Sequence, residues 1–424
     1  MAGTRTERRP DRAAGVKPVK RGLGVDVLTA AQHRIARVFD DFPRVYVSFS
    51  GGKDSGVLLE LAAQEARRRG RRIGVLFVDL EAQYTLTIDY VAATLERHAD
   101  VIDPHWVALP LNLRNAVSQF EPQWMCWDPG RRDDWVREPH PSSITDEDRF
   151  PFFRRRMEFE DFVPQFGHWY AAGGDEPADP RLTACLVGIR SQESLNRWRT
   201  VATKRKRRHD GLAWTTWLGG HVYNAYPIYD WATQDIWRFY GRTRTPYNRL
   251  YDRMHQAGLT IHQARICQPY GDDQRRGLWL YHVIEPETWS RVVARVNGAN
   301  FGAAHARDAG NVLGRIKITK PDDISWQEFA HRLLASMPPD TAEHYRDKIS
   351  VFLNWYDLRG YPGGRIPDDG PLDKSHPSWK RICKALLTYD YWCKGLSFNP
   401  PANRESYKRY RNVVKARREK WQYI

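Results

Sequence analysis

The sequence predicts an α/β protein with a doubly wound, mainly parallel sheet and a helical C-terminal extension. Residues 45–49 form a β-branched and aromatic run of strand length, and residues 73–78 form a second, continuous apolar run. Between these runs, apolar residues recur at helical spacing from Val57 to Ala66. Strand, helix and strand in this order predict a right-handed crossover unit, from which doubly wound sheets are built.

The pattern divides the chain into three parts. Residues 1–24 mix arginines with Pro and Gly and predict a flexible basic arm. Residues 25–245 predict the α/β domain, with a first helix before Pro43 and a third strand within 101–109. Residues 246–424 predict a mainly helical extension with a basic tail. Its helical patterns cover residues 279–296, 326–337, 342–356, 378–391 and 404–421.

The composition favours a folded protein of the cytoplasm. The chain has 424 residues, of which 41% are hydrophobic, so it can bury a large core. We expect no membrane span, because no run approaches the roughly 18 apolar residues that one requires, and the basic N-terminus has no apolar signal core. The five cysteines are few and scattered, which does not predict a disulfide framework.

Positive charge is concentrated at the two ends of the chain. The formal net charge is +15, and residues 1–22 and 404–424 together supply 11 of it. A third basic block covers residues 204–208. Such blocks bind nucleic-acid phosphates, so nucleic acid is a candidate partner. The alternative is that the basic tails only keep the chain soluble.

A glycine-containing loop between the first strand and the next helix is the main candidate site. It reads Ser50-Gly51-Gly52-Lys53-Asp54-Ser55. Glycines let the backbone approach a ligand closely, and the helix that follows offers unpaired amides and a positive dipole to an anion. The loop therefore predicts phosphate binding, although it lacks the glycine spacing of the Walker loop.

Two further segments follow strands and should reach the same edge of the sheet. Asp79 and Glu81 follow the second strand, where ligands of open α/β sheets bind; the alternative is that they cap the next helix. The segment Gly188 to Arg197 follows a strand at 184–187 and carries Arg190. Guanidinium groups bind phosphate or sulfate in a planar, bidentate manner. Further on, Asp230 is expected to cap the helix that contains Ile236.

These motifs resemble those of a known superfamily. The loop at 50–55 resembles the SGGxDS pyrophosphate loop of the adenine nucleotide α-hydrolases. Residues 188–197 resemble the G-[IL]-R-x-x-E-S-x-x-R motif of phosphoadenylylsulfate (PAPS) reductases, also found in the sulfur-transfer component of DNA phosphorothioation systems. Residues 226–237 resemble the P-I-x-D-W-x-x-x-D-[IV]-W element of the same group. The resemblance implies a HUP-type, PAPS reductase-like domain.

The resemblance also implies ATP and Mg²⁺ as cofactors and assigns roles to residues. The residues with catalytic roles would be Lys53, Asp54, Arg190 and Arg197, and Asp54 would orient the loop or bind Mg²⁺. The residues that bind the nucleotide would be Ser50, Gly51, Gly52, Lys53, Ser55, Asp79, Glu81, Gly188 and Glu193.

The second half of the chain resembles the immunoglobulin-binding regulator A proteins. The resemblance rests on residues 245–248, 265–278 and 297–302. These relatives are reductase-like and usually pair with a ParB/sulfiredoxin-like protein, which implies such a partner here. Cys267, in a polar and Arg-rich loop, is the candidate reactive thiol; its alternative is a half-buried structural thiol. The other cysteines considered, Cys126, Cys383 and Cys393, are expected to be buried and inert.

Three functions follow from these observations. The first is an ATP-dependent enzyme that cleaves the bond between the α- and β-phosphates, linked to sulfur transfer or nucleic-acid modification. The second is PAPS reduction, which needs a nucleophilic cysteine; the C-terminal cysteine motif of the classical reductases is absent from this sequence. The third is a nucleotide sensor that acts through a partner or DNA without turnover.

Overall fold

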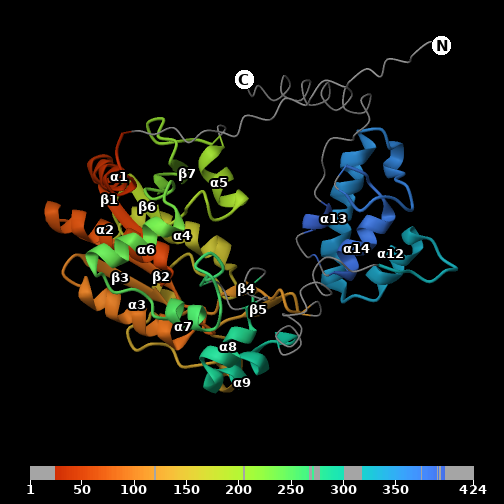
Figure 1. Ribbon diagram of the computed structural model, residues 1–424, viewed down its shortest axis with the longest axis horizontal. Coiled ribbons are helices and arrows are strands. Elements are labelled where there is room, and N and C mark those ends of the chain that lie inside the picture. Colours follow the sequence, from red (N-terminus) through yellow and green to blue (C-terminus); the bar gives the residue numbers. More distant parts are fainter. Residues whose placement is uncertain are drawn as a thin grey trace, which may run out of the picture.

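The computed structural model describes most of the chain and confirms the α/β class. The described residues are 24–118, 121–203, 206–266, 270–271, 277–299, 318–373, 375–388, 390 and 393–396. A mainly parallel sheet is flanked by helices, and a group of helices follows it along the chain (Figure 1).

A six-stranded sheet forms the centre of the first region, in the order β3-β2-β1-β6-β8-β7. Its strands are β1 (Arg44–Ser48), β2 (Ile73–Val78), β3 (Ile102–Val107), β6 (Thr183–Val187), β7 (Thr215–Gly219) and β8 (Val222–Ala225). Only the edge strand β7 runs antiparallel to its neighbour. β2 and β3 extend the sheet on one side of β1, and β6 pairs with its other side. The winding therefore reverses between β1 and β6, which is where doubly wound sheets bind ligands.

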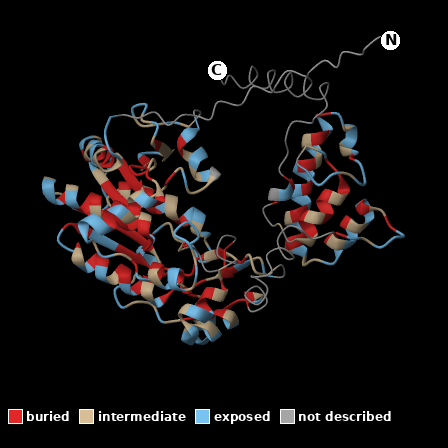
Figure 2. Ribbon diagram, viewed as in Figure 1, coloured by how far each residue is buried: buried red, intermediate tan, exposed pale blue. Residues whose placement is uncertain are grey.

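Alternate residues of the central strand enter two different cores. Val45 and Val47 pack against α1, α2, α3 and α6 on one face, whereas Tyr46 points to the other face, which α4, α7, α8 and α9 cover. Figure 2 shows the strands as the most buried part of this region. The helices are α1 (Val27–Asp41), α2 (Lys53–Arg69), α3 (Thr85–Arg97), α4 (Phe159–Ala171), α5 (Leu195–Ala202), α6 (Thr233–Thr243), α7 (Leu250–Gln256), α8 (Trp279–Ile284) and α9 (Pro286–Arg295).

The chain between β3 and α4 is less regular. It contains an antiparallel ribbon of β4 (Asn112–Arg114) and β5 (Gln123–Met125) and the short 3₁₀ helices η1 (Pro129–Asp134) and η2 (Glu147–Arg149). This segment packs on the same core as α4 and supplies Trp124 and Trp127 to it.

The C-terminal helices have a hydrophobic core of their own. They are α12 (Trp326–Ala335), α13 (Pro339–Asp357) and α14 (Trp379–Leu387), with η3 (Pro362–Gly364) and η4 (Lys394–Leu396). Phe352, Tyr356, Ile382 and Leu386 are buried among them. In the described part of the chain, no helix is long and apolar enough to span a membrane.

The core of the sheet region continues past residue 245, because α7, α8 and α9 pack in it, and a separate core begins near Ile318. Two local expectations are wrong. The helix expected over 279–296 is divided into α8 and α9 at Pro286, which lacks an amide proton. Asp230 does not cap α6, whose N-cap is Ala232; its carboxylate instead binds the guanidinium of Arg34 at 2.7 and 2.8 Å.

Candidate functional site

The loop after β1 lies at the reversal of the sheet, between β1 and α2. Gly51 has a φ of 69°, and a Cβ at this position would lie 2.8 Å from Cγ2 of Thr87. A side chain is therefore excluded by both conformation and space. Gly52 is the N-cap of α2 and offers no side-chain acceptor to the first amides of the helix. The 17-residue helix α2 thus begins as an anion-binding N-terminus does.

The two serines of the loop bind each other. Their hydroxyl oxygens are 3.0 Å apart, and the backbone amide of Ser50 donates to Oγ of Ser55 at 3.2 Å. The Ser55 hydroxyl also lies 3.1 Å from the carbonyl oxygen of Gly52. These contacts close the loop on itself. Ser55 is buried, whereas Ser50 is exposed and can reach a ligand.

Lys53, Asp54 and Arg190 form a charged cluster at this loop. Nζ of Lys53 lies 3.1 Å from one carboxylate oxygen of Asp54, and Nε of Arg190 lies 2.6 Å from the other. The side chains of Lys53 and Arg190 are only 5% and 2% exposed, so water screens their charge weakly. Arg190 also donates to the hydroxyl of Thr233 at 3.2 Å. Two cations and one carboxylate leave an excess positive charge beside the helix N-terminus, as an anionic ligand requires.

Gly188 permits this cluster to form. A Cβ on it would lie 3.0 to 3.1 Å from backbone atoms of Asp54 and Ser55. The segment after β6 therefore packs directly on the first turn of α2, and this close approach places Arg190 beside Asp54.

Asn248 and Tyr251 hold the loop from behind. Nδ2 of Asn248 donates to the carbonyl oxygen of Gly51 at 2.9 Å and to the hydroxyl of Thr87 at 3.0 Å. The hydroxyl of Tyr251 accepts the backbone amide of Lys53 at 3.1 Å, and its ring centroid lies 5.2 Å from the ammonium group of that lysine. Neither role was predicted from the sequence. Asn248 entered only through the family resemblance of residues 245–248, and Tyr251 was not singled out.

Tyr240 of α6 is a third support that sequence reasoning missed. Its hydroxyl donates to the carbonyl oxygen of Lys53 at 2.7 Å. Burial raises the pKa of Tyr240 well above its usual value, so the hydroxyl stays protonated and remains a donor. The sequence showed this residue only as an apolar position of the helix.

Glu193 and Arg197 lie at the start of α5 and pair with each other. Their side chains are 2.8 Å apart, and that of Arg197 is 42% exposed. Arg197 therefore lies at the rim of the site and is not part of the ion pair between Asp54 and Arg190. The backbone carbonyl of Glu193 accepts a hydrogen bond from Arg265 at 2.9 Å.

Asp79 and Glu81 are fully buried, and protein groups occupy their carboxylates. Asp79 accepts the indole N–H of Trp106 at 3.0 Å and forms an ion pair with Arg137. Glu81 binds Arg295 of α9 through two contacts of 2.5 and 3.0 Å. Neither residue caps α3, whose N-cap is Tyr84. Their predicted contact with a nucleotide stays a prediction, and the observed role is to bind the segment after β2 to the residues that flank η1 and to α9.

The four cysteines that the structure describes are buried. Burial raises the pKa of Cys185, Cys383 and Cys393 to about 12 and raises that of Cys126 further. A neutral thiol is a poor nucleophile, so the expected inertness of Cys126, Cys383 and Cys393 agrees with their surroundings. Cys267, the candidate reactive thiol, lies outside the described residues.

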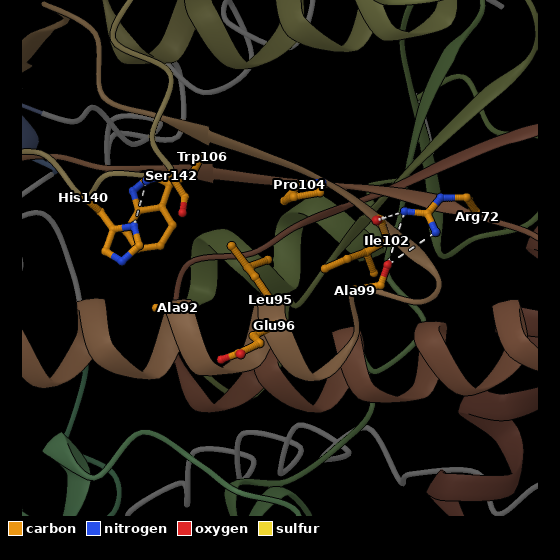
Figure 3. A pocket seen from close by; sticks show the side chains of 10 residues that line it. All are labelled: Arg72, Ala92, Leu95, Glu96, Ala99, Ile102, Pro104, Trp106, His140 and Ser142. Carbon is orange, nitrogen blue, oxygen red and sulfur yellow. Dashed lines mark hydrogen bonds between the residues drawn. The ribbon is translucent and has the colours of Figure 1, made fainter.

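A cavity of about 490 Å³ lies apart from the loop, between α3 and the edge strand β3 (Figure 3). The ring of His140 stacks on Trp106 at one end, with centroids 4.3 Å apart, and Arg72 lies at the other. Because Trp106 also binds Asp79, its indole separates the cavity from that carboxylate. No residue of the 50–55 loop lines this cavity.

The donors for Mg²⁺ are few at this site. Within the described residues, no cluster of three or more His, Cys, Asp or Glu side chains could hold a metal by itself. Asp54 is the carboxylate nearest the loop, and each of its oxygens keeps a lone pair beyond the contacts with Lys53 and Arg190. A Mg²⁺ ion that arrives with nucleotide phosphates and keeps several waters fits one such carboxylate.

Comparisons with protein families match both halves of the chain. The phosphoadenosine phosphosulfate reductase domain matches residues 44–129 and 178–265. The domain of unknown function DUF3440 matches residues 258–368. The first match contains β1, α2, β6 and the cluster of Lys53, Asp54 and Arg190.

Relatives match over very different lengths. The uncharacterized protein YbdN of Escherichia coli strain K12 is 45% identical over 402 residues, which are 94% of this chain and 97% of that protein. The uncharacterized protein MJ0066 of Methanocaldococcus jannaschii is 28% identical over 209 residues, which are 49% of this chain and 34% of that protein.

Solved structures resemble the chain more distantly. The PAPS reductase from Candida auris in its phosphate complex has a TM-score of 0.27 and 13% identity, covering 53% of this chain and 84% of that one. The U34-tRNA thiolase NcsA from Methanococcus maripaludis with its [4Fe-4S] cluster has a TM-score of 0.30 and 11% identity, covering 70% and 91%.

The family assignment rests on the long match with YbdN and on the reductase-domain match, which contains the loop and the switch-point strands. The chain belongs to the same family as YbdN, and its residues 44–129 and 178–265 match the phosphoadenosine phosphosulfate reductase domain.

Proposed function

We propose that the chain binds ATP at the loop 50–55 and cleaves the bond between its α- and β-phosphates. An oxygen nucleophile of an acceptor, or of water, forms a bond to the α-phosphorus and gives up its proton. The bond from the α-phosphorus to the bridging oxygen breaks, and pyrophosphate leaves with the electron pair. The products are pyrophosphate and an adenylated acceptor, or AMP. The observation that carries this proposal is the convergence of Lys53 and Arg190 on Asp54 at the N-terminus of α2.

The loop supplies the binding half of this chemistry. The backbone amides near Gly51 and Gly52, the ammonium of Lys53 and the exposed hydroxyl of Ser50 would bind the pyrophosphate portion. Asn248 and Tyr251 fix the backbone of the loop before a ligand arrives, so little reorganisation is needed on binding. The ammonium of Lys53 and the dipole of α2 would act together on the pyrophosphate, where negative charge develops as it leaves.

Arg190 supplies charge stabilisation at the transferring group. Asp54 holds its guanidinium through Nε, which leaves Nη2 to face an α-phosphate oxygen. Arg197, exposed at the rim of the site, would bind the same phosphate or the incoming acceptor. Mg²⁺, when bound, would neutralise phosphate charge, and Asp54 is the residue of this chain that would hold it.

Pyrophosphate release from ATP tests this function. We expect the wild-type chain to release pyrophosphate and Lys53→Ala to lose at least about 100-fold of the rate, since removal of one oxyanion-binding donor costs a factor of that order. Lys348→Ala, which removes an exposed lysine of α13, is the matched control and should keep the wild-type rate. Equal rates in all three proteins would refute the assignment of the loop.

PAPS reduction is a second candidate, favoured by the matched domain family. It requires a thiolate that attacks the sulfonate, and the four described cysteines are buried with raised pKa values. The reaction would therefore depend on Cys267. Attack of the thiolate on the sulfonate would leave the sulfonate bound to the cysteine and expel adenosine 3′,5′-bisphosphate, and an added dithiol would then release sulfite and become a disulfide. With the dithiol present, sulfite release from PAPS that Cys267→Ser abolishes would support reduction, and no sulfite from the wild type would remove this candidate.

The partner and the use of the adenylate are further parts of the proposal. We propose a role in sulfur transfer or nucleic-acid modification together with a ParB-like protein, as the resemblance in the second half of the chain implies. A nucleotide sensor without turnover is the alternative in another class. It would bind ATP tightly and release no pyrophosphate, with or without an acceptor.

A further inference from the structure

An exposed basic and aromatic surface lies beside the candidate site. Its members are Trp198 and Arg199 of α5 and Lys206 and Arg207 next to β7, and we call it the α5–β7 surface. Trp198 is 52% exposed, and no other Trp, Tyr or Phe in the described ranges is classed as exposed. An exposed tryptophan among basic side chains offers a flat ring on which a planar group can stack.

Helix α5 presents this ring close to the charged cluster. The helix begins five residues after Arg190, and the hydroxyl of Ser194 caps it by accepting the amide of Arg197 at 3.2 Å. Val201 is 8% exposed and anchors the helix, whereas Trp198, one turn earlier, is 52% exposed. Figure 1 shows α5 near β7, at one side of the sheet.

The segment before β7 continues the surface. The guanidinium of exposed Arg207 lies 4.4 Å from the ring centroid of Trp217. Nζ of Lys206 donates to the carbonyl oxygen of Thr200 at 2.7 Å, which ties this segment to α5. Burial, and to a smaller extent the neighbouring Arg208, lower the pKa of Lys206 to about 8.

The charge of this region has one sign. Residues 194–208 contain seven Lys or Arg and no Asp or Glu. The adjoining carboxylates are paired: Glu193 with Arg197 at 2.8 Å and Asp210 with Arg37 at 2.9 Å. A partner that neutralises such a surface must carry repeated negative charge.

We propose that the α5–β7 surface binds single-stranded nucleic acid, with a base stacked on Trp198 and phosphates bound by Arg199 and Arg207. An exposed aromatic ring among arginines is the arrangement that binds unpaired bases, because every base has a face to stack and each linkage carries a negative charge. Duplexes keep their base faces inside the stack and cannot use the ring. Helix α5 begins five residues after Arg190 in the chain, so a bound strand would be a candidate acceptor; strand binding itself does not depend on ATP chemistry.

The test measures binding of the full-length chain to fluorescent strands of about 16 nucleotides at about 0.15 M salt. Oligo-dT, oligo-rU, a duplex and an abasic strand of equal length are compared. The basic termini can bind phosphates of any strand, so the informative quantity is the difference between the base-bearing and the abasic strand. Trp198→Ala and Trp198→Phe are the variants. Arg238→Gln, which removes a 71% exposed arginine of α6, is the control.

We expect Trp198→Ala to weaken binding of oligo-dT or oligo-rU about tenfold and to leave the abasic strand unchanged. Trp198→Phe should retain most of the affinity, and Arg238→Gln should bind as the wild type does. The stronger of the dT and rU arms identifies DNA or RNA. Unchanged binding by Trp198→Ala, an equal loss on the abasic strand, or preference for the duplex would overturn the proposal. Lys53→Ala should bind strands normally, so a failure of the ATP chemistry would not be mistaken for a failure of this surface.

Discussion

Nε of Arg190 lies 2.6 Å from the carboxylate of Asp54, although 136 residues separate the two in the sequence. The contact joins the segment after β6 to the first turn of α2 at the reversal of the sheet. Both partners are largely buried, and Asp54 also binds Lys53. One carboxylate therefore sets the position of both cations that face the proposed phosphates.

Asp54→Asn should destabilise the fold in the absence of nucleotide. The substitution leaves Lys53 and Arg190 buried without a counter-charge, and removal of one partner from such a cluster costs about 3 kcal/mol. Urea unfolding measures the loss. ATP should restore more stability to this variant than to the wild type, because the phosphates neutralise both cations. Asp347→Asn on the surface of α13 is the control, and equal losses in the two variants would contradict the role of Asp54.

Gly51→Ala should cost more stability than Gly70→Ala. Both glycines have positive φ values, 69° and 61°, so the backbone strain is similar. A Cβ at Gly51 would lie 2.8 Å from Thr87, whereas a Cβ at Gly70 would have no neighbour within 4 Å. We expect the difference in unfolding free energy to be about 1 to 3 kcal/mol, the usual cost of overpacking. Equal losses would show that the space behind Gly51 is not restrictive.

Asn248→Ala should weaken nucleotide binding as well as stability. The buried amide holds the carbonyl oxygen of Gly51, and loss of a buried donor costs about 1 to 3 kcal/mol. Calorimetric titration with ATP and thermal unfolding measure the two effects. Asn354→Ala, on the exposed face of α13, should change neither. Reduced stability with unchanged ATP affinity would make Asn248 a structural residue only.

Alkylation should be slow at the buried thiols of Cys185, Cys383 and Cys393. Because burial raises the pKa of Cys185, Cys383 and Cys393 to about 12, these thiols ionise only as the pH approaches that value. Iodoacetamide followed by mass spectrometry should therefore find little modification of them between about pH 7 and pH 9. Rapid labelling of any of the three in folded protein would show that its surroundings are open to solvent.

The sequence predicted those features that depend on local pattern. The loop 50–55, the strands beside it and the position of Arg190 follow from short motifs and from the rule that ligands bind at carboxyl ends of parallel strands. The contacts of Asn248 and Tyr251 depend on segments almost 200 residues away from the loop, and no spacing in the sequence shows that they meet.

The same limit applies to the buried carboxylates and to the division of the chain. Glu81 pairs with Arg295, which lies 214 residues further along the chain. The acidic side chain predicted a ligand contact, because no local pattern in the sequence shows that a protein group binds its carboxylate. Helical periodicity located α8 and α9 only as one helix over 279–296, did not predict α7, and could not show which core these helices enter. Proline at 286 was a local signal for the break between α8 and α9 and could have been used.

The most direct test is the identity of the product made from ATP labelled at its γ-phosphate. Cleavage between the α- and β-phosphates predicts labelled pyrophosphate, together with AMP or an adenylated acceptor, and loss of this product in Lys53→Ala. Labelled orthophosphate with ADP would place the cleavage at the γ-phosphate instead. That result would contradict the central claim, even if Lys53 were required for it.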